Sequence, residues 1–125
     1  MNTHIDIDQG RLRVTLHGLD IVWTTRRRMI VPLAHVVGAR LDPYIHRRGP
    51  WLGAGRTDAL LGYAVAAGSM VVHGRHEFWD VHHPEKAIVI DLVDEAYDRL
   101  VLEVDDPDAL VVEINAAVAT SEAAA

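Results

Sequence analysis

The last third of the chain carries the pattern that most narrows the possible folds. Two apolar triplets alternate there with other residues: Ile88, Ile90 and Leu92, and then Leu100, Leu102 and Val104. Alternation of this kind places each triplet on one face of a β-strand. Residues 94–96, Asp-Glu-Ala, are typical of the turn between them. We therefore expect two antiparallel strands joined by a turn, with the apolar face of both strands in the core.

A helix is predicted directly after these strands. Asp106 suits the N-cap, Pro107 the first helical position, and Asp108 the positive end of the helix dipole. Apolar residues then follow at helical spacing: Leu110, Val111, Ile114 and Val118. Glu113 and Asn115 are expected to point away from this stripe. A cap contributes about 1 kcal/mol and burial of four aliphatic side chains several times more, so packing decides whether the helix forms.

Shorter alternating stretches predict further strands upstream. They cover residues 4–8, 11–17, 19–23, 29–33, 36–41 after a bend, 70–73 and 77–81. About seven strands followed by one amphipathic helix favour a mainly β fold, in which the helix closes one open end of a bent antiparallel barrel or sandwich. The pleckstrin-homology superfold has this architecture.

Length and composition limit the domain organisation. A chain of 125 residues matches one domain, which we assign to residues 1–119, with a frayed tail at 120–125. The absence of cysteine excludes disulfide scaffolds, thiolate zinc sites and thiol nucleophiles. The longest apolar run, residues 59–72, is shorter than the roughly 20 residues of a membrane span. With no signal-peptide pattern at the start, we expect a cytoplasmic protein.

Several segments resemble a known family. They are residues 77–81 (Glu-Phe-Trp-Asp-Val), 84–90 (Pro-Glu-Lys-Ala-Ile-Val-Ile), 97–101 (Tyr-Asp-Arg-Leu-Val), 104–107 (Val-Asp-Asp-Pro) and 30–36 (Ile-Val-Pro-Leu-Ala-His-Val). Together they resemble a family of small uncharacterised actinobacterial proteins with a bacterial pleckstrin-homology-like fold. The resemblance spans residues 10–118 and is more specific in its C-terminal half. It implies the fold, and it implies no activity, ligand or catalytic residue.

A long irregular region rich in Gly, Pro and Arg is the first candidate for function. Residues 42–57 form a loop longer than most connections in compact domains, and such loops are usually functional or mobile. Its aromatic and arginine residues belong to the types enriched at interaction hot spots: Tyr44, Arg47, Arg48, Trp51 and Arg56. These five are the predicted partner-binding or ligand-binding residues. A loop folded back over the core and anchored by Trp51 would explain the same residues.

A histidine cluster is the second candidate. Imidazole and carboxylate groups gather between His73 and Glu85, and both are ligands for zinc and similar ions. If a metal binds, the predicted ligands are His73, His76 and His82. A solvated hairpin rich in histidine is the competing interpretation and the one we favour. No cofactor is predicted.

Charge is distributed unevenly along the chain. Residues 1–75 contain ten arginines and five acidic residues, a net charge of +5, whereas residues 76–125 carry −11. The basic residues are dispersed and lack interleaved aromatics, so the nucleic-acid signal is not strong.

The sequence therefore favours a non-catalytic binding or scaffold domain that acts through protein–protein contacts, either with another protein or as a homodimer. One alternative is a metal-dependent or small-ligand enzyme that uses the cluster from His73 to His83. The other is weak binding of anionic lipid or nucleic acid by the arginine-rich first half.

Overall fold

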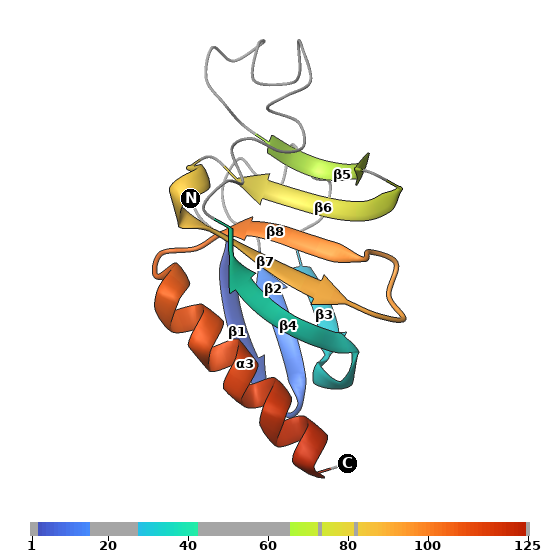
Figure 1. Cartoon of the computed structure of the whole chain (residues 1–125), viewed down its shortest axis with the longest axis vertical. Coiled ribbons are helices and arrows are strands. Elements are labelled where there is room, and N and C mark those ends of the chain that lie inside the picture. The colour runs from blue at the N-terminus through green and yellow to red at the C-terminus, as the bar shows by residue number, and fades with distance from the viewer. Residues whose placement is uncertain (1–2, 16–27, 43–65, 73, 82, 125) are drawn as a thin grey trace.

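The computed structural model describes residues 3–15, 28–42, 66–72, 74–81 and 83–124. These ranges form two β-sheets and one long helix (Figure 1). The elements are β1 (His4–Asp8), β2 (Arg11–Thr15), β3 (Arg28–Pro32), η1 (Leu33–His35), β4 (Val36–Leu41), β5 (Ala66–Val72), β6 (Arg75–Val81), η4 (Pro84–Lys86), β7 (Ala87–Leu92), β8 (Arg99–Glu103) and α3 (Pro107–Ala124). The described residues are mainly β with one C-terminal helix, as the sequence predicts.

The smaller sheet is an antiparallel meander in the order β1-β2-β3. Gln9 and Gly10 connect β1 to β2 with φ values of 52° and 74°. Two successive positive φ angles make the tight turn whose twist matches that of the flanking strands. Asp6 lies directly opposite Arg13 and accepts a hydrogen bond from it, which raises the pKa of Arg13.

The larger sheet has the order β4-β7-β8-β6-β5. Its neighbours are antiparallel except for β6 and β8, which are parallel. The expectation of a purely antiparallel architecture is wrong at this pair. The chain leaves β6 through η4 into β7, and β8 then returns between β7 and β6. Leu100, Val101 and Leu102 of this central strand are fully buried, which is typical of a strand covered on both faces.

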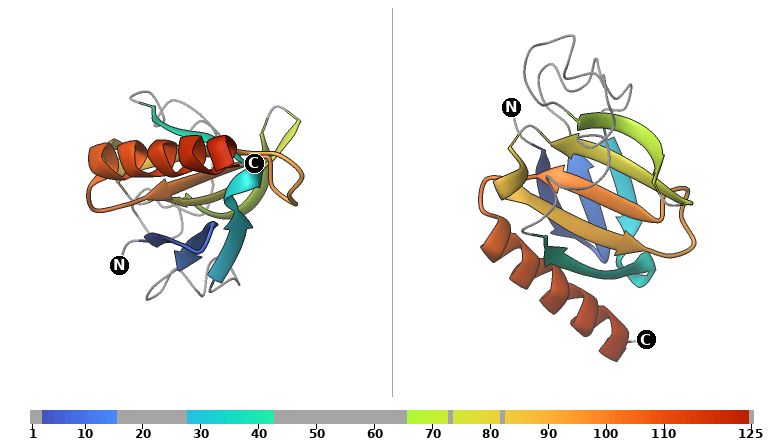
Figure 2. Two further views of the ribbon diagram at one scale, coloured as in Figure 1. Left: turned by 90° about the horizontal axis from the view of Figure 1, so that it is seen from below. Right: turned by 45° about the horizontal axis from the view of Figure 1, so that its top comes forward.

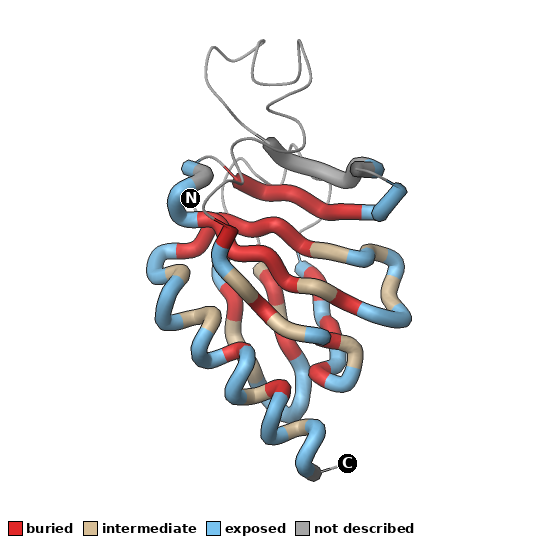
Figure 3. Tube along the Cα trace, viewed as in Figure 1, coloured by how far each residue is buried: buried red, intermediate tan, exposed pale blue. Residues whose placement is uncertain are grey.

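The two sheets stack, and their strands cross steeply (Figure 2). The main core lies between them and takes residues from both sheets and from the helix. Both predicted triplets belong to it. Ile88, Ile90 and Leu92 lie in β7; Leu100 and Leu102 lie in β8, and Val104 directly follows β8. The longest runs of buried residues lie in β6, β8 and β7 (Figure 3).

The chain changes sheets at a corner between β3 and β4. Pro32 ends β3, and the N–H of Leu33 donates to the carbonyl of Gly10 at 2.9 Å. After η1 the chain enters β4, which pairs with β7 of the other sheet. The predicted bend between residues 33 and 36 is confirmed, and it is the point where the chain crosses from one layer to the other.

Helix α3 begins where the sequence predicts. Asp106 Oδ1 accepts a hydrogen bond from the N–H of Ala109 at 3.2 Å, as an N-cap side chain does. Ile114 and Val118 are buried in the main core, and the helix lies along β4 (Figure 1). The helix continues to Ala124, so it includes residues 120–124, which the sequence assigns to a frayed tail.

Asn115 does not point away from the fold, and this prediction is wrong. Its side chain accepts a hydrogen bond from the N–H of Ala39 at 2.8 Å and donates one to the carbonyl of Ala39 at 2.9 Å. An amide offers the same donor and acceptor as a peptide group, so Asn115 takes the place of a neighbouring strand at the β4 edge. Glu113, in contrast, is exposed as predicted.

Candidate functional site

The five predicted binding residues of the long loop lie outside the described residues: Tyr44, Arg47, Arg48, Trp51 and Arg56. The same is true of His73 and His82, two of the three predicted metal ligands. These predictions therefore stay predictions. Within the described ranges, no group of three or more histidine, aspartate or glutamate side chains could hold a metal ion.

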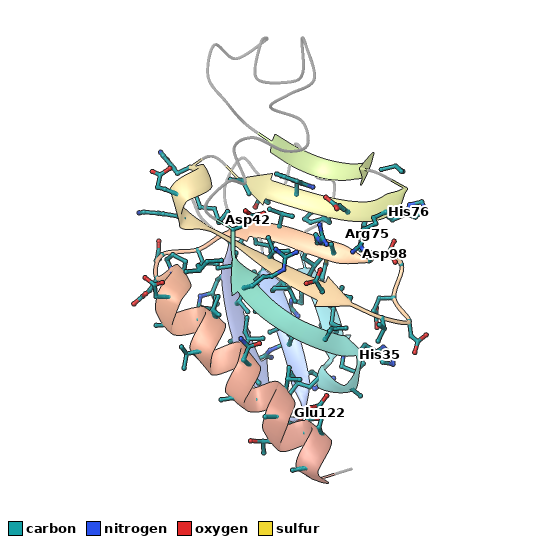
Figure 4. The ribbon with its side chains drawn as sticks, in the orientation of Figure 1. His35, Asp42, Arg75, His76, Asp98 and Glu122 are labelled. Atoms are coloured by element: carbon teal, nitrogen blue, oxygen red, sulfur yellow. The ribbon has the colours of Figure 1, made fainter. Side chains whose placement is uncertain are left out.

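His76, the third predicted ligand, lies at the start of β6 beside Asp98 (Figure 4). Its backbone N–H donates to Asp98 Oδ2 at 2.9 Å, and its carbonyl accepts the N–H of Asp98 at 2.7 Å. His76 therefore has a structural role through its main chain, which joins β6 to the connection before β8.

A cavity of about 210 Å³ opens between the two sheets at this end of the molecule. One wall is β3, an edge strand of the smaller sheet, and the other is the segment from Leu92 to Leu100 that joins β7 to β8. The apolar lining comes from Met29, Val31, Leu92, Tyr97 and Leu100. The ring of Tyr97 packs against that of Phe78 with centroids 5.5 Å apart.

The wall formed by the β7–β8 connection is held on both sides. On one side, the carbonyl of His35 accepts the N–H of Val93 at 2.9 Å, and His35 Nδ1 lies 2.6 Å from Glu95 Oε2. On the other side, Asp98 makes its two hydrogen bonds to His76. This part of the cavity is therefore formed before any ligand binds.

Two opposite charges line the cavity. Arg28 comes from the β3 wall, and Glu95 comes from the β7–β8 connection. No ion pair joins them within the part of the chain that the structure describes. His35 contacts Oε2 of Glu95, and within the described residues the other carboxylate oxygen has no such contact. The cavity thus combines an apolar lining with one positive and one negative group.

The opposite face of the larger sheet carries a ladder of charged side chains. Arg40 Nε lies 3.3 Å from Asp91 Oδ2, and Arg99 Nε donates to Asp91 Oδ1 at 3.0 Å. Arg99 also contacts Glu77 Oε2 at 3.4 Å, and Glu77 Oε1 accepts the indole N–H of Trp79 at 2.8 Å. The ladder crosses β4, β7, β8 and β6, because Arg99 lies directly opposite both Asp91 and Glu77 in the sheet register.

A second apolar cluster shares this face. It consists of Trp79, Val81, Ala87, Val89 and Val101, all buried. Glu103 is buried beside it and accepts the backbone N–H of His83, whose ring Nδ1 lies 3.1 Å from Glu103 Oε2. The carboxylates Glu77 and Asp91 are engaged with arginine, so we assign the ladder a structural role.

The two edges of the larger sheet differ. At the β4 edge, helix α3 lies alongside and Asn115 pairs with the main chain. At the other edge, β5 pairs with β6 alone within the described ranges. Every second residue of such an edge strand directs its N–H and C=O away from the sheet.

Comparison of the chain with models of protein families, with curated proteins and with solved structures finds no match in any of the three. Within the described residues, no helix combines the length and the apolar character that crossing a membrane requires.

Proposed function

We propose that this chain is a non-catalytic scaffold domain of pleckstrin-homology-like type that acts through protein–protein contacts at the β5 edge. The proposed kinship with the actinobacterial family is supported by two stacked, crossing sheets with a C-terminal helix along one side. The parallel pairing of β6 with β8 departs from a purely antiparallel arrangement. The binding role itself is carried by the contrast between the two edges of the larger sheet.

Among the described residues, the β5 edge shows none of the devices that normally prevent strand addition. Its sequence, Ala-Ala-Gly-Ser-Met-Val-Val, contains no charged residue and no proline. Natural edge strands are usually shielded by lysine, proline, bulges or a covering element. The β4 edge of the same sheet has such a covering element in α3 and Asn115. An extended strand that pairs with β5 would gain main-chain hydrogen bonds along seven residues.

The occupant we propose is a second copy of the chain, with the two β5 strands pairing across a twofold axis. Such an interface places the same strand on both sides. Because β5 is uncharged, the two paired strands themselves place no like charges opposite one another, despite a net charge of −6 on each chain. Val71, whose side chain is 63% exposed, adds apolar surface at this edge.

Sedimentation velocity of the purified protein over a range of concentrations tests the proposal. The weight-average mass should rise toward that of two chains as concentration increases. Val71→Lys should shift this rise to higher concentration, because each dimer would carry two added charges on strands that are otherwise uncharged. The matched control is Val112→Lys on α3, where valine is 69% exposed and lies on a different element.

Wild-type protein that stays monomeric at every concentration would overturn self-assembly. A dimer that Val71→Lys and Val112→Lys affect equally would exclude β5 as its interface. Circular dichroism of both variants shows whether the fold is retained.

A further inference from the structure

We propose that the cavity between β3 and the β7–β8 connection binds a free α-amino acid with an apolar side chain. This site is separate from the β5 edge and does not depend on the proposed assembly. The inference rests on three observations: the cavity's size, its apolar lining, and the single positive and single negative group that line it.

Size limits the ligand. A dry cavity of about 150 Å³ accepts benzene, and pockets for drug-sized molecules measure about 300–1,000 Å³. At about 210 Å³, this cavity holds one ring or a branched aliphatic group with a small polar head. Met29, Val31, Leu92 and Leu100 provide apolar contacts for such a group.

The two charges select the polar head. The Arg28 guanidinium can bind a carboxylate through two parallel hydrogen bonds, and the free oxygen of Glu95 can accept from an ammonium group. A simple anion would meet repulsion from Glu95, and a simple cation would meet repulsion from Arg28. Both residues line one cavity of about 210 Å³, so a single small ligand can contact both, and a zwitterion is the head that satisfies both.

The bound state follows from these contacts. The side chain would enter between the two sheets, against Leu92 and Leu100, while the head stays at the rim with Arg28 and Glu95. The connection between β7 and β8 is already held by His35 and His76, so little main-chain ordering is needed on binding.

Two-dimensional NMR titration with four small molecules tests the proposal without any substitution. L-phenylalanine and L-leucine should shift the methyl signals of Leu92 and Leu100 saturably. 3-Phenylpropionate lacks the ammonium group and 2-phenylethylamine lacks the carboxylate. Each should bind about tenfold more weakly than phenylalanine, since each loses one charge-assisted contact. No saturable shift with either amino acid, or equal binding of phenylalanine and 3-phenylpropionate, would overturn the proposal.

Two variants then test which side chain binds each charged group of the ligand. Arg28→Gln should weaken phenylalanine binding about tenfold and remove the preference over 2-phenylethylamine. Glu95→Gln keeps an acceptor for His35 and should remove the preference over 3-phenylpropionate. The controls are Arg11→Gln and Glu85→Gln, both at exposed positions that do not line the cavity. If both variants still prefer phenylalanine over the two analogues as strongly as the wild type does, Arg28 and Glu95 are not the groups that bind the charged head.

Discussion

The side-chain amide of Asn115 pairs with both the N–H and the C=O of Ala39, at 2.8 and 2.9 Å. Ala39 lies in β4, the edge strand of the larger sheet, and its main-chain groups would otherwise face the helix without a strand partner. The contact joins residues 76 positions apart in the chain. It fixes α3 along the strand and closes that edge to other chains.

Replacing Asn115 with Ala should destabilise the domain. Two neutral hydrogen bonds are lost, and alanine recovers part of the loss through its better helix propensity, so the free energy of unfolding should fall by about 0.5–1.5 kcal/mol. Urea denaturation measures the change. Glu113→Ala on the same helix controls for propensity, because Glu113 is exposed. Equal stability of the two variants would show that the pairing contributes nothing.

Gly38 should be coupled to this contact. A Cβ at position 38 would lie 3.3 Å from Asn115 Oδ1, which forces the amide to shift by a few tenths of an ångström. Gly→Ala otherwise stabilises by about 0.4–1 kcal/mol through the unfolded state. We therefore expect Gly38→Ala to be more favourable in Asn115→Ala protein than in the wild type. A double-mutant cycle measures the difference, and additive effects would contradict the predicted coupling.

Arg99 should be the central member of the charged ladder. Arg99→Met leaves Glu77, whose side chain is 3% exposed, without its cation. Breaking a buried pair costs about 3–5 kcal/mol, and we expect about 2–3 here because Arg99 is 18% exposed. Chemical denaturation measures the loss, with exposed Arg11→Met as the control. The double variant Arg99→Met/Glu77→Gln should lose less than the two single losses combined, and strict additivity would count against the pair.

The N-cap of α3 can be tested at Asp106. Asp106→Ala removes the acceptor for the N–H of Ala109 and should lower the unfolding free energy by about 1 kcal/mol. Asp108→Ala, in the first turn of the same helix, loses only its interaction with the dipole and should cost about 0.3–1 kcal/mol at low salt. Added salt should reduce the second effect more than the first. An Asp106 effect that disappears in salt would indicate a purely electrostatic role.

Local features of the fold are readable from the sequence. The alternation of Ile88, Ile90 and Leu92 identifies the core face of β7, and Asp106-Pro107 identifies the start of α3. Each of these signals depends on residues a few positions apart, so spacing alone reveals them.

Contacts between distant strands could not be predicted in the same way. The parallel placement of β8 beside β6 depends on which strands the chain brings together. The alternation of apolar residues identifies the buried face of a strand, but it does not identify the neighbouring strand in the sheet. The continuous apolar run from Ala87 to Ile90 is the signal that β7 is covered on both faces.

The candidate site was missed for a related reason. Arg28 lies in β3 of the smaller sheet and Glu95 lies in the connection between two strands of the larger sheet, so their common cavity appears only when the sheets stack. Asn115 looks like an ordinary polar residue of a helix until β4 is placed beside it.

Amide hydrogen exchange, followed by NMR at low and high protein concentration, tests the central claim most directly. We predict that the Ala39 amide exchanges slowly at both concentrations, because Asn115 protects it within each chain. The β5 amides that point away from β6 should exchange rapidly in dilute protein and slowly in concentrated protein, where a second chain covers them. Exchange of the β5 amides that does not depend on concentration would contradict assembly through this edge.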